Sequence, residues 1–398
     1  MAAVFIPLTE PIGRAPQRGG FALWALGFRP FYLLAALLAA LWVPLWALQF
    51  SGVLGTPVLR GPAWHAHEMV FGFTQAVVVG FLFTAGRNWS GQPTPTGKPL
   101  MALAALWLAG RALVLSPWPL AALVVNVAFP LAAAWGLWRA LRAGGNRRNY
   151  FFVGLLLALA AACGALHLSQ SGAGVPARLG TTVPLDVVIF IIAVITGRVV
   201  PMFSNNGVPG LNAQRRPQVE RAALGSTLAL LAADVAGLGA PLLSAVLAVA
   251  LVAHGVRLWG WQPWGTRGNP LVWVLHLACL WLPVHLALRL GTEWGAVPQG
   301  LATHALTVGL IGTLTLGMMT RTALGHTGRP LRAGRIEITA YMAISLAAGV
   351  RVGLPLLHPA ALLLAVNLSA ALWSLAWLLY LWRYTPWLCR TRADGQPG

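Results

Sequence analysis

Apolar runs of about 20 residues follow one another along almost the whole chain. A helix of that length crosses the hydrocarbon core of a bilayer, and it satisfies its own backbone hydrogen bonds where lipid cannot. Only 9% of the 398 residues are charged, whereas a soluble domain carries about a quarter. The sequence therefore predicts an all-α integral membrane protein, a polytopic bundle of twelve transmembrane helices. The predicted spans are about 31–49, 66–86, 99–116, 119–138, 150–169, 183–202, 221–238, 241–258, 270–289, 300–319, 335–354 and 360–382.

The segments between the spans are short. None is long enough for a second folded domain, so we expect residues 1–398 to form a single transmembrane helical domain. The histidine positions of the first six spans do not match those of the last six. That mismatch argues against a transporter built from inverted repeats.

The net charge of +19 is distributed unevenly. If the N-terminus is cytoplasmic, 22 of the 27 basic residues fall on cytoplasmic segments and 5 on the opposite side. This alternation follows the positive-inside rule. The basic charge therefore indicates topology, with both termini cytoplasmic, and it does not indicate a nucleic-acid partner.

Nine histidines stand in this chain against eight carboxylates. Titratable groups are rare inside transmembrane segments and usually serve a function there, and imidazole is the commonest metal ligand in proteins. Histidines that converge inside a membrane bundle therefore suggest a bound metal or haem. Five histidines lie in or beside the apolar spans, His65, His67, His276, His285 and His304, and the candidates for cofactor binding are His65, His67, His276 and His304.

The first two candidates open the second span at its outer end. Residues two apart on a helix differ by about 200° of rotation, so His65 and His67 would point to opposite sides and could serve two centres. Alternatively, only His67 faces the bundle interior. His304 lies about one turn into the tenth span from the same outer side. The competing interpretation is that such residues are solvated by lipid headgroups.

Two arginines at inner span ends are further candidates for cofactor binding. Arg198 and Arg321 could pair with carboxylates such as haem propionates, or they could only anchor the topology. Residues 304 and 321 are 17 positions apart, which is about 25 Å along one helix, so one small site cannot contain both. We therefore predict two sites, an outer one with His65, His67 and His304, and an inner one with His276, Arg321 and His326, which follows span ten.

The three cysteines form no CxxC pair. Cys163 and Cys279 lie inside predicted spans, and Cys389 lies near the C-terminus. We interpret them as small core residues, because metal-binding and redox cysteines usually occur as closely spaced pairs.

Several short motifs in this order resemble the NnrS family of membrane proteins. They cover nearly the whole chain, and their number and order carry the resemblance, since each motif alone is weak. They are Gly27-Phe28-Arg29-Pro30-Phe31, Trp64 to Met69 followed by Phe71-Gly72, Asn88-Trp89-Ser90-Gly91, Gly197-Arg198 with Pro201-Met202-Phe203, Pro270-Leu271 through Leu275-His276-Leu277, His304 to Gly309, and Met319-Thr320-Arg321 running into Leu324 to Pro330.

The resemblance implies a twelve-helix protein of the bacterial inner membrane that contains haem and copper. Proteins of this family are linked to nitric oxide stress and denitrification. The motif histidines are His65, His67, His276, His304 and His326, whereas His167, His254, His285 and His358 fall outside the motifs.

These observations lead to one functional hypothesis and two alternatives. The hypothesis is a haem protein, with copper as a second metal, that binds nitric oxide or a similar diatomic ligand between spans two, nine and ten. The first alternative is a transporter or channel for a small solute or metal, whose histidines would bind transiently. The second is an assembly factor. The sequence leaves open whether the protein turns over a substrate.

The topology can be tested directly. We expect the loops containing Arg147, Arg216 and Arg332 to face the cytoplasm, because basic residues are retained on that side during insertion. Cysteines introduced into these loops should react with an impermeant maleimide only after the membrane is permeabilised. Labelling of the Arg332 loop in intact cells would invert the predicted orientation.

Overall fold

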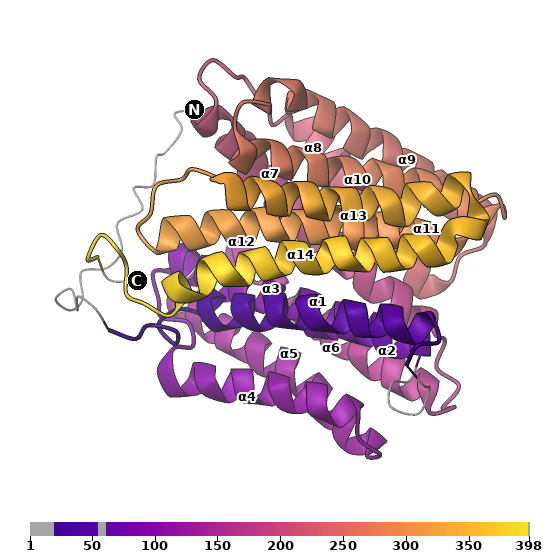
Figure 1. Ribbon diagram of the computed structural model, residues 1–398, viewed down its shortest axis with the longest axis horizontal. Coiled ribbons are helices and arrows are strands. Elements are labelled where there is room, and N and C mark those ends of the chain that lie inside the picture. Colours follow the sequence, from indigo (N-terminus) through magenta and orange to yellow (C-terminus); the bar gives the residue numbers. More distant parts are fainter. Residues whose placement is uncertain (1–19, 55–60, 397–398) are drawn as a thin grey trace.

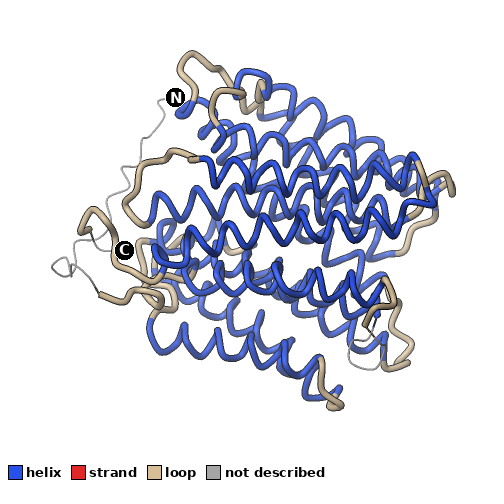
Figure 2. The backbone as a smooth tube through the Cα atoms, in the orientation of Figure 1, coloured by secondary structure: helices blue, strands red, loops and turns tan. Residues whose placement is uncertain are grey.

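The computed structural model describes residues 20–54 and 61–396, and within these ranges almost every ordered element is a helix. Figure 2 shows the helices as one bundle with loops at its two ends. The described chain contains no strand, and its only β-type pairing is an isolated bridge between Phe21 and Arg390. The predicted all-α fold is therefore confirmed.

The helices are, in chain order, α1 (Phe28–Phe50), α2 (Gly61–His67), η1 (Glu68–Thr74), α3 (Gln75–Ser90), α4 (Gly97–Val114), α5 (Pro119–Ala143), η2 (Arg147–Asn149), α6 (Phe151–Gln170), α7 (Arg178–Gly207), α8 (Pro217–Ala236), α9 (Ala240–Gly260), η3 (Pro263–Thr266), α10 (Pro270–Glu293), α11 (Gln299–His304), η4 (Ala305–Gly312), α12 (Thr313–His326), α13 (Arg335–Leu357), η5 (Pro359–Ala361) and α14 (Leu362–Leu388). The segments η1 and η4 are π-helical and join their neighbours into two continuous helices, Gly61–Ser90 and Gln299–His326.

Eleven helices of the described chain are long and apolar enough to cross a membrane. The remaining long helix is α8, which corresponds to the predicted span 221–238. It carries three charged residues, Glu220, Arg221 and Asp234. Both carboxylates are buried and paired with arginines, Glu220 with Arg257 and Asp234 with Arg289. The lower hydropathy of α8 therefore reflects polar contacts made inside the bundle.

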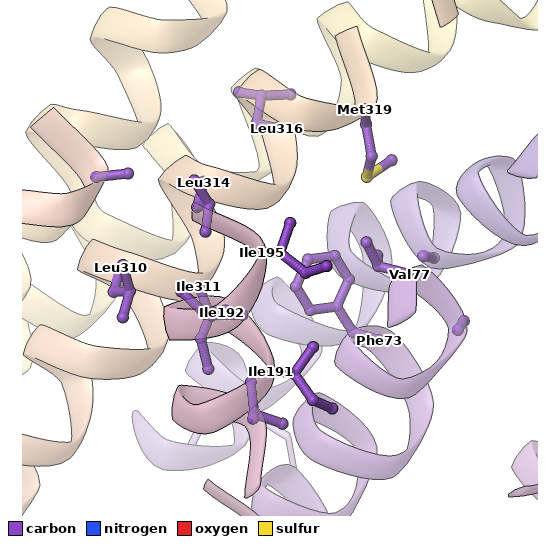
Figure 3. Packing of buried hydrophobic residues seen from close by; sticks show 14 of the residues in the cluster. Phe73, Val77, Ile191, Ile192, Ile195, Leu310, Ile311, Leu314, Leu316 and Met319 are labelled. Atoms are coloured by element: carbon purple, nitrogen blue, oxygen red, sulfur yellow. The ribbon is translucent and has the colours of Figure 1, made fainter. Parts of the chain in front are cut away.

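Three continuous helices form the centre of the bundle. They are Gly61–Ser90, Arg178–Gly207 and Gln299–His326, with 78%, 72% and 72% of their most apolar windows buried, whereas most of the other spans bury 39–44%. Figure 3 shows their contact, in which Phe73 faces Ile191 and Ile195 of α7, with Leu314 of α12 close by. Because these helices are covered mostly by protein, residues on their buried faces can bind a cofactor away from lipid.

The other helices pack around these three. From α4 through α10 each helix packs against the next one in the chain, with the central α7 among them, and α13, α14, α1 and α3 pack side by side in that order. Figure 1 shows α1 (indigo) lying beside α14 (yellow), so the first and last spans are neighbours. The bridge between Phe21 and Arg390 continues this contact beyond the helices.

The bundle has one arginine-rich end and one arginine-poor end. The arginine-rich end holds the α12–α13 loop and both ends of the described chain (Figure 1). The arginine-poor end holds α2 and α11, and with them His65 and His304. The orientation of these ends in a membrane stays a prediction, and its part that concerns the N-terminus falls on residues 1–19, outside the described ranges.

A buried ion pair ties three helices together in the arginine-rich half. The guanidinium of Arg257 (α9) donates from Nε and Nη2 to the two carboxylate oxygens of Glu220 (α8), each at 2.8 Å, and from Nη2 to the carbonyl oxygen of Ala193 (α7) at 2.6 Å. A Cβ atom at position 197 would collide with both side chains of the pair. Gly197, the glycine of the Gly197-Arg198 motif, therefore leaves room for the pair.

We expect Arg257→Leu to lower the free energy of unfolding by about 3 kcal/mol, because it leaves a carboxylate buried without its main partner. This loss of stability should fall at the low end of the range of about 3–5 kcal/mol for broken buried ion pairs, since Arg215 remains 3.6 Å from Glu220. Thermal unfolding of the purified protein in detergent measures it. Arg215→Ala is the control and should cost below about 1 kcal/mol, because half-exposed pairs contribute little. Equal losses in both variants would contradict the assigned role of Arg257.

Candidate functional site

A cavity of about 570 Å³ opens between helices at the arginine-poor end. Its size lies within the range of small-molecule and cofactor sites, about 300–1,000 Å³. Helices α1, α2, α7, α8, α9, α10, α11, α13 and α14 contribute to its wall together with η1 and η4. The residues of the wall that bear on its chemistry are His65, His285, His304, Arg289, Arg351 and Trp46.

The histidine of α11 is held in a defined orientation. The Nδ1 atom of His304 donates to the carbonyl oxygen of Gly300 at 2.6 Å, one helical turn earlier. This bond places the proton on Nδ1 and leaves the lone pair on Nε2, the arrangement that metal-binding histidines usually adopt. The guanidinium of Arg351 lies 3.4 Å from that Nε2.

The imidazoles of His65 and His304 face each other at the wall of the cavity. Their ring centres are 6.5 Å apart, and their planes differ by only 12°. On its other side, His65 stacks on the indole of Trp46 at 5.1 Å. The two imidazoles and the indole therefore form one aromatic group at the cavity wall, and imidazole is the commonest metal ligand in proteins.

A third histidine of the cavity offers an unpaired nitrogen. Nδ1 of His285 donates to the carbonyl oxygen of Ala302 at 2.8 Å, and its buried Nε2 has no hydrogen-bond partner. A buried polar atom without a partner is costly, so Nε2 is suited to bind something that enters the cavity. His285 lies outside the family motifs, and sequence reasoning gave it little weight.

Two histidines of the central helices, His67 and the cavity residue His304, lie next to π-helical turns. The segment η1 begins directly after His67, and η4 begins directly after His304. π-helical turns are rare and occur frequently at functional sites. Two glycines of η4 admit large side chains, because a Cβ at Gly309 or Gly312 would collide with Trp281 or Trp373, respectively. These glycines therefore serve packing.

The two arginines of the cavity differ in what neutralises them. Arg289 donates from Nη2 to both carboxylate oxygens of Asp234 (2.5 and 2.6 Å) and from Nη1 to Asp186 (3.3 Å). Arg351 forms no ion pair with any residue in the described ranges. A ligand carboxylate in this cavity would therefore find Arg351 as its available cation.

The structure separates one predicted member of the outer site from the other two. His67 does not line the cavity. It points toward α6, where its Nε2 lies 3.1 Å from Nε2 of His167, and its Nδ1 lies 2.9 Å from a carboxylate oxygen of Glu68. The rotation of two residues along one helix explains this, since His65 and His67 face different sides. The predicted outer group of His65, His67 and His304 is therefore corrected to His65 and His304.

The predicted inner residues do not converge on one point either. Nε2 of His276 lies 2.7 Å from the hydroxyl oxygen of Ser204, and the guanidinium of Arg321 lies 3.8 Å from the ring centre of Phe203. His326 is the last residue of α12, not a loop residue, and it packs against Phe28 of α1. The predicted inner group is therefore corrected: its members contact different neighbours.

The other arginine proposed for cofactor binding already has protein partners. Arg198 donates from Nη1 to the side-chain oxygen of Asn149 at 2.8 Å and lies within 6 Å of the rings of Trp89, Phe151 and Phe152. Neither Arg198 nor Arg321 lines the cavity. Their placement near the arginine-rich end fits the alternative in which they anchor topology.

Sequence reasoning missed two kinds of residue. Arg351 gave no local signal, because only the packing of α13 brings it to the cavity, and His285 was given little weight because it lies outside the family motifs. Cys163 and His167 did carry a signal: they are four residues apart on α6 and so share one helix face. A Cys-x-x-x-His pair within an apolar span was therefore available as evidence.

The chain was compared with known proteins. No curated protein matches it at a significant level. The family described as "NnrS protein" matches residues 22–392, which is nearly the whole chain. On this match, the chain belongs to the NnrS family of membrane proteins, which is linked to nitric oxide stress.

Proposed function

We propose that this protein binds haem in the cavity at the arginine-poor end, with copper as a second metal, and relieves nitric oxide stress in the inner membrane of denitrifying bacteria. The observation that carries the proposal is the pair His65 and His304. Their rings are nearly parallel, 6.5 Å apart, and they lie at the wall of a 570 Å³ cavity. The family's association with haem and metal binding supports the same assignment.

The residues present fit a haem group on three independent points. The cavity has the volume of a cofactor site. Its imidazoles offer the lone pair on Nε2 of His304, which now faces Arg351 at 3.4 Å, and the unpartnered Nε2 of His285. Arg351 is the cation that remains available for a propionate. Haem iron in proteins is commonly held by histidine, so the donor set and the group agree.

In this proposal the chain's own residues hold and orient the histidines that would bind the haem. Gly300 accepts the Nδ1 proton of His304 and keeps that ring turned toward the cavity. Trp46 supports His65 from behind. Haem held by these residues would supply an iron that binds diatomic ligands. Nitric oxide is small and apolar, so it needs no polar path to a site enclosed by apolar helices.

The alternative function, a transporter, would require a different arrangement of ionisable residues. Proton- or ion-coupled transport usually depends on ionisable residues placed along a path through the membrane. Here the buried carboxylates Glu68, Asp186 and Asp234 are each paired with an arginine. This pairing favours a structural role for them, and so favours the haem proposal.

We expect the purified protein to show a Soret band, and His65→Ala and His304→Ala each to lower haem content at least several-fold, because each removes one imidazole of the pair. The pyridine haemochromogen assay measures haem per chain. His254→Ala is the matched control: this histidine is also buried, but Thr227 is its hydrogen-bond partner and it does not line the cavity. A colourless wild-type protein, or full haem in both cavity variants, would refute the proposal.

A second prediction concerns the propionate contact. Arg351→Gln should weaken haem binding about tenfold or more, since a hydrogen bond to a charged group contributes about 1.5–3 kcal/mol. Arg351→Lys should recover part of the affinity, because it keeps the charge but not the planar fork. Haem titration of the apoprotein gives the dissociation constants. Unchanged affinity in Arg351→Gln would show that the propionates bind elsewhere.

A further inference from the structure

Beside the cavity, three side chains that commonly bind metals lie close together. They are His67 from α2, and Cys163 and His167 from α6, and their ligand atoms all lie within 4.8 Å of one another. Among the described residues, they form the only group of three such side chains that is close enough to hold one ion. His67 and Cys163 are buried, and His167 is half-buried at the rim.

The spacing of the three ligand atoms suits one metal ion. Nε2 of His67 lies 3.1 Å from Nε2 of His167 and 4.0 Å from Sγ of Cys163. Around an ion with bonds of about 2.0 Å to nitrogen and about 2.3 Å to sulfur, ligand atoms are roughly 3.3–3.8 Å apart. The two distances from Nε2 of His67 differ from this range by only a few tenths of an ångström, and the ligand atoms of Cys163 and His167 lie within 4.8 Å of each other. An ion between the three atoms would bring the ligand atoms of Cys163 and His167 closer together.

The surroundings orient the first of these ligands. Glu68 accepts the Nδ1 proton of His67 at 2.9 Å, which leaves the lone pair of His67 on Nε2. Carboxylates commonly hold metal-binding histidines in this way. Glu68 is itself paired with Arg111 at 3.4 Å. Gly72 permits this approach, because a Cβ there would collide with the guanidinium of Arg111.

The charge of the cluster discriminates between ions. Glu68 and Arg111 neutralise each other, and a monovalent ion that replaces the thiol proton of Cys163 leaves the net charge unchanged. A divalent ion would add one uncompensated charge among buried groups, which is costly. The thiol also lies in an apolar shell formed by Val70, Phe71, Ala162 and Leu166. The site therefore favours a soft monovalent ion.

We propose that His67, Cys163 and His167 form a binding site for one cuprous ion, separate from the haem cavity. Thiolate and imidazole are the ligands that copper prefers in proteins, and the combination of two histidines with one cysteine is a known copper donor set. The inference deepens the proposed function, since it gives the second metal of that proposal a location. Val70 and Leu185 lie between the two sites, because both line the cavity and both contribute to the apolar cluster around Cys163.

The competing explanation is purely structural. Without a metal, an N–H of His167 can donate to Nε2 of His67 and hold α6 against α2. That hydrogen bond needs no thiol. The two explanations therefore differ in what they predict for Cys163, which contributes a ligand only if an ion is bound.

The test is anaerobic competition for Cu(I) between the purified full-length protein and the chelator bathocuproine disulfonate. We expect the wild-type protein to retain one Cu(I) per chain, and Cys163→Ala and His167→Ala each to weaken binding at least tenfold. Glu68→Gln should weaken it by about 10- to 100-fold, as for other residues that orient a metal ligand. Cys279→Ala is the matched control, since this cysteine is equally buried but lies on α10 away from the cluster.

Several outcomes would overturn the inference. They are no retained Cu(I) in the wild-type protein, equal affinity in Cys163→Ala and Cys279→Ala, or equally tight binding of Zn(II) by the same three residues. Haem content is measured on the same samples. Loss of Cu(I) binding with normal haem in His167→Ala supports two separate sites. Cysteine-dependent Cu(I) binding in a haem-free protein would refute the haem proposal and leave this inference standing.

Discussion

The structure depends on the inability of hydrocarbon to solvate polar groups. A buried carboxylate or guanidinium inside the bundle must find a partner within the protein. Five buried carboxylates of the described chain each form an ion pair with an arginine from another helix. The pairs are Glu68 with Arg111, Asp186 and Asp234 with Arg289, Glu220 with Arg257, and Glu337 with Arg383.

These pairs do more than satisfy charge, because each joins two different helices. The Arg257 pair links α7, α8 and α9, and the Arg289 pairs link α7, α8 and α10. The helices around the cavity are thereby held in register near its polar residues. A cavity between apolar helices alone would be free to close, since nothing directional would hold its walls apart.

Most buried charged groups are paired, so polar groups of the cavity that lack a partner indicate where a ligand fits. His285 has an unpartnered Nε2, and Arg351 has no carboxylate within the described ranges. Both line the same cavity as His65 and His304. The π-helical turns beside the central histidines lie in the same region. Two polar groups that the protein does not satisfy by itself, Nε2 of His285 and the guanidinium of Arg351, thus lie where the cofactor is proposed to bind.

Much of the fold could be predicted from the sequence, because length and hydropathy are local properties. The apolar runs predicted the long helices, although α8 was less apolar than the rest because its carboxylates are paired inside the bundle. The ends of helices were less accurate: His326 was assigned to a loop and belongs to α12. The polar residues near that end satisfy the helix backbone and continue it past the apolar run.

The sequence by itself determined that this is a bundle of membrane-spanning helices, that its basic residues gather toward one end, and which motifs place it in its family. Only the tertiary structure decided which histidines lie together. His65 and His67 are two residues apart, yet one faces His304 and the other faces His167. Helix periodicity predicts that their side chains point in different directions. Which neighbour each side chain contacts depends on how helices distant in sequence pack together. Contacts between α2, α6 and α11 are long-range, and no local pattern encodes them.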